Sequence, residues 1–438
     1  MVDVVPTISV PTSSGVRDIE VREPSAPLAP VSHIEPNLRR LRVYLAVYEC
    51  GGVHRAAKKL HLSESSLTRA VQQLEAQVGR ALFERRPRGM VGNGFGAILA
   101  ERTRRALKHL DLAETEILNS RRDAYAVGRS RGFSAKVTYR QLCALIAIAD
   151  YQTQTVAARE LALTQPALTL SLRSLERLVG EPLFLRTARG MVATPVGDIL
   201  SRRAKLAFSE VVAASSDIAA RAGTLSGSVV VGVLPLSGTL LVPRAVNLLL
   251  REHPSIQIKM VDGTYQSQIQ GLLCGNIDLI VGGLDYRSPA EIVQEPLFDD
   301  WLSIVARKGH PLFARETLSL TDLAGAEWVV SPGGTPARIS FDRVMSSAGL
   351  GIGSNPIIAN ASPVRALLME SDRLAAMSRH QIHFEEFTGL LDILPIKLSG
   401  TNLAIGIRIR ADTPPSASVN ALIRHLRELS ADMRKVRY

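Results

Sequence analysis

Two segments of the chain carry the same pattern of hydrophobic and polar positions. Apolar residues recur at the i, i+4, i+7 and i+11 spacing of a single helical face, which indicates a helix packed against a core. In the first segment this stripe consists of Leu67, Val71, Leu74 and Val78. In the second segment it consists of Leu168, Leu172, Leu175 and Val179. The offset is 101 positions throughout, so the pattern predicts two copies of one helix.

The repeat extends beyond these helices, because residues 38–99 correspond without a gap to residues 139–200. Ser63 and Thr164 stand just before each stripe, where an N-cap residue belongs. The preceding segment holds two adjacent alanines in both copies, at 56–57 and 157–158. Their small side chains allow two helices to cross closely, so each copy predicts a helix-turn-helix unit.

The face opposite each stripe is the candidate contact with double-stranded DNA. Arginine suits guanine edges, glutamine suits adenine, and hydroxyl groups and helix N-terminal amides suit phosphates. The predicted DNA-binding residues of the first copy are Ser63, Ser65, Ser66, Thr68, Arg69 and Gln72. Those of the second copy are Thr164, Gln165, Pro166, Thr169 and Arg173. A plain solvated helix face is the alternative interpretation.

A short hairpin follows each helix and is typical of a wing. Arginines near its tip are expected to hold phosphates beside the groove. They are Arg85, Arg86 and Arg88 in the first copy and Arg186 and Arg189 in the second. Each wing leads into a long stretch rich in Ala, Leu and Arg, and helices of this kind commonly pair with another copy.

From residue 227 onward, short apolar runs alternate with helical stretches, which predicts an α/β architecture with a parallel sheet. The first expected strand covers residues 229–233, and residues 234–238 form a loop that opens a helix. Further strands are expected at 256–260, 277–281, 303–306, 328–330 and 403–409. Such folds bind ligands where the C-termini of strands meet free helix N-terminal amides.

Composition narrows the class of protein. With 438 residues, 46% of them hydrophobic, the chain is long enough for several cores. A formal net charge of +11 favours an anionic polymer or surface as partner. The three cysteines, at 50, 143 and 274, have neither metal-ligand nor disulfide spacing, which is typical of a reducing cytoplasm. We expect no metal and no cofactor.

The chain is expected to contain several domains. Residues 1–36 are rich in proline and lack the features of a signal peptide, so they predict a disordered tail. No apolar run is long enough to span a bilayer, so we expect a cytoplasmic protein without a membrane partner. The expected fold class is two α-rich winged helix-turn-helix domains followed by a two-part α/β domain. We call the two winged helix-turn-helix domains the first and the second reader. The boundaries are 37–96 for the first reader, 97–136 for a linker helix and connector, 137–197 for the second reader, 198–226 for a second linker helix, and 227–438 for the α/β domain.

The repeated unit resembles the DNA-binding domain of the LysR-type transcriptional regulators. That domain runs Ala-Ala, a short turn, Ser-Gln-Pro-Ala-Leu-Ser-Arg, Leu-Glu, Gly, Leu-Phe and Arg. Residues 164–169 read Thr-Gln-Pro-Ala-Leu-Thr, and Leu170 stands at the arginine position. The first copy keeps Arg69 but has Glu64-Ser65 in place of Gln-Pro and Asn93 in place of a later threonine. Residues 227–438 look most similar to the branch of the galactose-binding-protein and protocatechuate regulators.

The resemblance implies that the C-terminal domain has two lobes, like a periplasmic binding protein. One lobe would comprise residues 227 to about 298 and about 400–438, and the other about 299–399. A small effector, a sugar or a carboxylate-bearing metabolite, would lie between them, and the chains would form a homodimer or homotetramer. The implied effector-binding residues are Pro235, Leu236, Ser237, Gly238, Gly283, Ser331, Thr335, Arg338, Ser362, Met377 and Ser378.

Three other interpretations compete with this one. An enzyme is disfavoured because no Gly-x-Ser-x-Gly, paired His-Cys ligand set or Walker lysine motif occurs. A transport binding protein fits residues 227–438 alone, but two basic readers and the absence of an export signal argue against it. A regulator in which one helix-turn-helix copy is only structural stays open.

Overall fold

The computed structural model describes residues 34, 36–86, 89–120, 132–188, 190–235, 237–284, 288–359 and 361–433, except for the side chains at 85, 86, 89, 361, 362 and 432. The expected disordered tail therefore lies outside the described residues, apart from Ile34 and Pro36. Within the described part of the chain, no helix has the length and apolar character to cross a bilayer.

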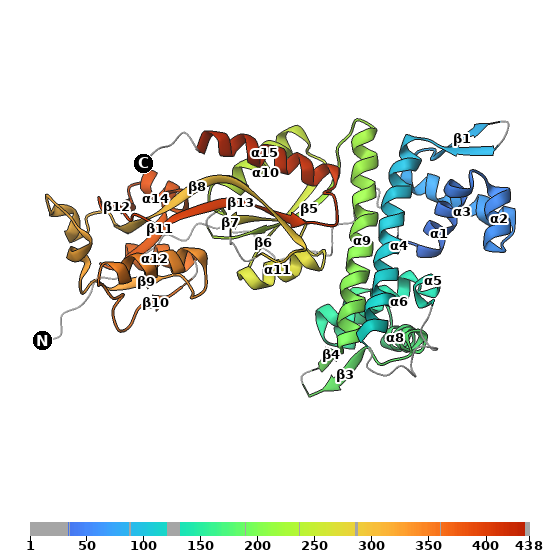
Figure 1. Cartoon of the computed structure of the whole chain (residues 1–438), viewed down its shortest axis with the longest axis horizontal. Coiled ribbons are helices and arrows are strands. Elements are labelled where there is room, and N and C mark those ends of the chain that lie inside the picture. Colours follow the sequence, from blue (N-terminus) through green and yellow to red (C-terminus); the bar gives the residue numbers. More distant parts are fainter. Residues whose placement is uncertain are drawn as a thin grey trace, which may run out of the picture. The chain divides into compact units, whose positions relative to one another are not determined.

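The first repeat forms three helices and a hairpin (Figure 1). The helices are α1 (Leu38–Cys50), α2 (Val53–Leu60) and α3 (Glu64–Val78), and the hairpin pairs β1 (Phe83–Arg86) with β2 (Gly89–Gly92) in antiparallel fashion. Ser63 caps α3, since its side chain accepts a hydrogen bond from the amide of Ser66 over 3.3 Å. The stripe residues Leu67 and Leu74 are fully buried, as the helical spacing predicted.

The second repeat has the same order of elements. It comprises α6 (Tyr139–Tyr151), α7 (Gln154–Glu160), α8 (Gln165–Val179), β3 (Phe184–Thr187) and β4 (Gly190–Ala193), preceded by the short α5 (Phe133–Lys136). Thr164 caps α8 by accepting from the amide of Ala167 over 3.4 Å. All four predicted stripe residues of α8 are buried.

Equivalent contacts fix the hairpin to the third helix of each repeat, α3 or α8. The Oε1 atom of Glu75 accepts from the amide of Leu82 over 2.8 Å, and that of Glu176 accepts from Leu183 over 2.9 Å. Asn93 replaces a threonine in the sequence but performs the same task as Thr194. Its side chain accepts from Gly96 N, as that of Thr194 does from Gly197 N.

A long helix follows each repeat, α4 (Gly94–Ser120) after the first and α9 (Pro195–Arg221) after the second. The two helices pack against each other along their length (Figure 1). They run antiparallel, because Phe95 at the start of α4 meets Arg221 at the end of α9, and Glu116 near the end of α4 meets Arg202 near the start of α9. The expected pairing with another copy thus takes place between two segments of one chain.

In the described residues from 227 to 433, the strands form one nine-stranded sheet. Its strands are β5 (Gly227–Val233), β6 (Ile256–Asp262), β7 (Leu279–Gly283), β8 (Ile292–Arg307), β9 (Trp328–Val330), β10 (Ile357–Ile358), β11 (Leu374–Ser378), β12 (Leu391–Ile393) and β13 (Asn402–Arg410). The order is β10-β9-β11-β8-β13-β7-β5-β6, and β12 also pairs with β8. The expectation of a parallel sheet is wrong in part: β8 and β13 run antiparallel to their neighbours, so the sheet is mixed.

The long strand β8 connects the two parts of this sheet. Its first residues, up to Trp301, pair with β13, whereas Leu302–Val305 pair with β11. The part that contains β5, β6, β7 and β13 carries α10 (Leu241–Glu252) and α15 (Ala417–Met433), which pack against each other (Figure 1). It also carries α11 (Tyr265–Leu273). The other part carries α12 (Pro336–Ser347), α13 (Ala361–Met369), α14 (His383–Phe387) and the short 3-10 helices Pro311–Ala314, Leu320–Leu323 and Arg379–Ile382.

Candidate nucleic-acid interface and ligand pocket

The outer face of α3 is polar and exposed. All six residues predicted to bind DNA on this helix and its cap are exposed: Ser63, Ser65, Ser66, Thr68, Arg69 and Gln72. Arg69 lines a shallow hollow of about 330 Å³ together with Arg39 and Arg40 of α1. Three guanidinium groups thus lie close to the exposed helix face, which is favourable for a polyanion.

Glu64 begins α3 and is the acidic departure noted in the sequence. Its Oε1 atom lies 2.6 Å from Nδ1 of His54 on α2, and both side chains are exposed. A carboxylate in the first turn also suits the positive end of the helix dipole. Both interactions lie within the first repeat and explain how an acidic residue is accommodated at this position.

The outer face of α8 is less polar. Thr164, Gln165, Pro166 and Arg173 are exposed, while Thr169 is half-buried and donates its hydroxyl hydrogen to the carbonyl of Gln165 over 2.9 Å.

Two of the three arginines that line the hollow beside α3 have no cationic equivalent in the second repeat. Arg40 corresponds to Gln141, and Arg69 corresponds to Leu170, whose side chain is 64% exposed. The two repeats therefore present the same shape with different chemistry.

The wing arginines are only partly described. Arg186 is exposed on β3, beside the hairpin tip. The side chains of Arg85 and Arg86, and the residues Arg88 and Arg189, lie outside the described residues.

A pocket of about 420 Å³ lies where strands from both parts of the C-terminal sheet end. Five of the predicted effector residues line it: Pro235, Gly283, Ser331, Thr335 and Met377. They follow or belong to β5, β7, β9 and β11, so the structure gathers them from segments that are far apart in sequence.

Four other predicted effector residues do not line the pocket. Ser237 is buried and donates to the carbonyl of Val281 over 2.7 Å. Ser378 is fully buried and donates to the carboxylate of Asp300. Arg338 pairs with Asp342 over 2.7 Å and does not line the pocket, and neither does Gly238. The pattern after each strand identified the loops, but hydrogen bonds and ion pairs with neighbouring strands and helices hold these side chains outside the pocket lining.

Two predicted residues cannot be placed. Leu236 lies outside the described residues, as does the side chain of Ser362.

Sequence reasoning missed part of the lining. The loop after β6 contributes Gly263, Thr264, Tyr265 and Gln266, and the opposite wall contributes Gln381. Thr264 caps α11 by accepting from Ser267 N over 3.2 Å. A capping threonine that follows a strand was a usable signal, since it marks a helix N-terminus at a strand end.

The electrostatics of this pocket come from backbone groups. No charged side chain lines it among the residues that the structure describes, but the N-termini of α11 and α12 both reach it, through Thr264 and Thr335. Behind the wall, the buried Arg408 donates to the carbonyl of Gly283 over 2.8 Å. Free amides at helix N-termini and a nearby guanidinium favour an anionic group in the ligand.

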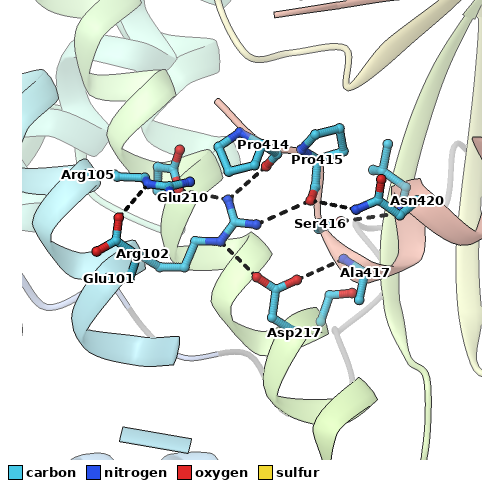
Figure 2. A network of polar contacts seen from close by, with 12 residues as sticks. Glu101, Arg102, Arg105, Glu210, Asp217, Pro414, Pro415, Ser416, Ala417 and Asn420 are labelled. Atoms are coloured by element: carbon cyan, nitrogen blue, oxygen red, sulfur yellow. Dashed lines mark hydrogen bonds and ion pairs between the residues drawn. The ribbon is translucent and has the colours of Figure 1, made fainter. Parts of the chain in front are cut away.

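A buried polar network joins α4, α9 and the segment before α15 (Figure 2). The guanidinium of Arg102 donates to Asp217 over 2.8 Å, to Glu210 over 2.9 Å and to the carbonyl of Pro414 over 3.0 Å. Asp217 also accepts from the amide of Ala417 over 2.8 Å. Burial opposes the charge of Arg102, but Asp217 and Glu210 raise its pKa, so the group stays protonated.

Comparisons with known proteins agree with this architecture. A family model described as the LysR substrate binding domain matches residues 222–431. A second, described as bacterial regulatory helix-turn-helix protein, lysR family, matches residues 38–97 and again 139–198. The HTH-type transcriptional regulator GalR of Pseudomonas putida is 33% identical over 90% of this chain and 97% of its own. The regulator PcaQ of Agrobacterium fabrum is 30% identical over 68% of this chain and 96% of its own.

Solved structures share the fold. Full-length OxyR of Pseudomonas aeruginosa has a TM-score of 0.53 at 19% identity, over 66% of this chain and 95% of its own. CbnR, a LysR family transcriptional regulator, has a TM-score of 0.50 at 19% identity, over 67% of this chain and 99% of its own.

Helix-turn-helix units with exposed polar recognition helices, joined to a two-part ligand-binding module, define a transcriptional regulator with an effector-binding domain. The matched models and the relatives identify its family. The chain belongs to the LysR family of transcriptional regulators.

Proposed function

We propose that this regulator carries a tandem duplicated winged helix-turn-helix and that both copies contact double-stranded DNA. The observation that supports this most strongly is the pair of exposed recognition helices, α3 and α8, on equivalent frameworks. The domain limits follow the repeat: 37–96 and 137–197 for the readers, 97–136 and 198–226 for the linkers, and 227–438 for the effector-binding domain, with the lobes dividing near 299 and 400.

The long alignment with GalR supports the duplication. The alignment covers 90% of this chain and 97% of the relative. The unaligned residues are fewer than one reader contains, so the alignment extends into both readers. PcaQ, by contrast, covers only 68% of this chain.

The two readers should contribute unequally to DNA affinity. Residues 38–97 hold eleven Lys or Arg against four Asp or Glu, whereas residues 139–198 hold six against five. Phosphate neutralisation by cations dominates affinity and makes it salt-dependent. The first reader therefore supplies most of the electrostatic attraction, and the second supplies shape and hydrogen-bonding contacts.

Binding to the DNA that flanks the protein's own gene, measured at several salt concentrations, tests this proposal. Arg69→Ala should cost about 1–3 kcal/mol on the specific site and relax the preference at one base pair. Arg173→Ala should weaken binding as well, at a different base pair. If Arg173→Ala changes nothing and the footprint keeps its length without residues 1–130, the alternative is correct: one helix-turn-helix copy is only structural.

We also propose that a small polar metabolite, carboxylated or sugar-like, binds in the pocket between β5, β7, β9 and β11. The helix N-termini at Thr264 and Thr335 support a carboxylate in particular. Differential affinity of this ligand for two arrangements of the chain would then shift DNA binding. We further propose a cytoplasmic, non-enzymatic protein that works as a homodimer or homotetramer, whose size sedimentation would measure.

A further inference from the structure

The buried faces of α4 and α9 match position by position. Gly96, Leu99, Ala106 and Ile117 are buried on α4, and their equivalents 101 positions later, Gly197, Leu200, Ala207 and Ile218, are buried on α9. The remaining buried positions of α4 also have buried equivalents on α9, except that the equivalent of Arg102, Arg203, is half-buried. Both helices therefore use the same face to pack on each other.

The polar contacts across this interface are reciprocal. The Nε atom of Arg102 donates to Asp217, while the Nε atom of its equivalent, Arg203, donates to Glu116 over 3.0 Å. Glu116 is itself the equivalent of Asp217. In addition, Nη1 of Arg102 donates to Glu210, and Nη1 of Arg203 lies 3.5 Å from Nδ1 of His109, the equivalent of Glu210.

An interface in which residue i meets j and j meets i is the signature of a two-fold axis between identical partners. Here the partners are two segments of one chain. Each reader is attached to its helix in the same way, because the glycine of each helix start lies against the preceding loop: a Cβ at Gly96 would fall 2.2 Å from Leu82 O, and at Gly197 it would fall 2.1 Å from Leu183 O. The readers are consequently related by the same approximate two-fold axis as the helices.

We propose that a single chain is an internal pseudo-dimer that reads both half-sites of one operator, with the half-sites inverted relative to each other. This rests on the proposed DNA contact of both readers. Two readers related by a two-fold axis match two inverted half-sites, as two subunits of a helix-turn-helix dimer do. The α4–α9 interface is satisfied within the chain, so no second chain is needed to position the readers.

The two half-sites must differ in sequence. Arg69 and Gln72 of the first recognition helix correspond to Leu170 and Arg173 of the second. A guanidinium reads guanine, whereas an exposed leucine contacts a thymine methyl group. The operator therefore contains one motif for each reader, at a fixed spacing, and has a defined direction.

Selection from random duplex DNA with the full-length chain tests the proposal. The expected product contains two unlike motifs. Footprinting should show both motifs protected, and native mass spectrometry should show one chain for each duplex that carries one pair of motifs. Arg69→Ala should change the preference in one motif only, and Arg173→Ala in the other only. Selection of a single motif per chain would overturn the pseudo-dimer, whereas a complete lack of sequence-specific binding would overturn the proposed DNA contact itself.

Charge reversal decides whether the helix pair is internal. Arg203→Glu should lower affinity about tenfold or more, because like charges then face each other across the interface. Adding Glu116→Arg in the same chain should restore binding, which also shows that the variant framework folds. An equal mixture of Arg203→Glu chains and Glu116→Arg chains should not restore it; restoration in the mixture would show that the helices pair between chains. Arg315→Glu, in an exposed pair with Asp322 of the C-terminal half, is the matched control and should leave binding unchanged.

Discussion

Nε of Arg102 on α4 lies 2.8 Å from Oδ2 of Asp217 on α9, although 115 positions separate the two residues. The same guanidinium reaches the carbonyls of Pro414 and Pro415, and the same carboxylate reaches the amide of Ala417 (Figure 2). One ion pair therefore touches the helix of each reader and the effector-binding half. A shift of the segment before α15 would act directly on the helix pair.

Removing this guanidinium should be costly. Arg102→Ala leaves Glu210 buried without its ion-pair partner, and loss of one member of a buried pair costs about 3–5 kcal/mol. The free energy of unfolding, followed by circular dichroism in urea, measures the effect. Arg315→Ala breaks an exposed pair with Asp322 and should change the free energy of unfolding much less, because solvent screens that pair. Equal losses for the two variants would contradict the role assigned to Arg102.

Leu170 offers a gain-of-contact test in the second reader. Leu170→Arg places a guanidinium where the first reader has Arg69. If α8 lies in the groove, the salt dependence of binding should steepen by up to about one unit in log K against log salt, and guanine should become favoured at one base pair. Fluorescence anisotropy on labelled duplexes gives both quantities. Leu170→Ala is the control, and an unchanged slope and preference for Leu170→Arg would place α8 away from the DNA.

The pocket can be tested by filling it. Ala376 lies on β11 in the pocket wall, and Ala376→Phe should take up space that the ligand needs. In a thermal-shift screen of sugars and carboxylic acids, a true effector raises the apparent stability of the wild type through its affinity for the folded state. It should not stabilise Ala376→Phe, whereas Ala324→Phe, at an exposed position outside the pocket lining, should respond like the wild type. Stabilisation of all three proteins would place the ligand elsewhere.

His109 should make the helix pair sensitive to acid. Its pKa is lowered to about 4, mainly by burial; Asp412 opposes this shift, and Arg203, Arg410 and Lys108 add to it. The folded protein then keeps His109 neutral, while the unfolded chain binds a proton below about pH 6.5, so stability falls as the pH drops from about 6.5 towards 4.

At pH 5 the penalty from His109 is about 2 kcal/mol. Comparing the unfolding free energies of the wild type and His109→Gln at pH 7.5 and pH 5 measures it. The variant should lose less stability on acidification than the wild type. The same loss in both proteins would show that His109 is not the responsible group.

Much of the DNA-reading half was predictable from local pattern. The stripe of Leu67, Leu74 and their equivalents, the caps Ser63 and Thr164, and the hairpins depend on contacts only a few residues apart, so periodicity and capping chemistry were sufficient. The family followed from the same residues. The expected strands of the C-terminal half overlap β5, β6, β7, β8, β9 and β13, but β10, β11 and β12 were not predicted. The strand β8 was expected as residues 303–306 and extends over Ile292–Arg307, because its length is set by partners on both sides of the sheet.

The sequence by itself determined the repeat, its offset and the chemistry of each recognition helix. Only the tertiary structure decided that α4 and α9 pair within one chain, that Arg102 meets Asp217, and that Ser237 and Ser378 turn away from the pocket into internal hydrogen bonds. These features depend on segments that are far apart in the chain coming together. A local pattern specifies which face of a helix is apolar but not which other element of the chain buries that face. Burial against any complementary surface satisfies the same hydrophobic requirement.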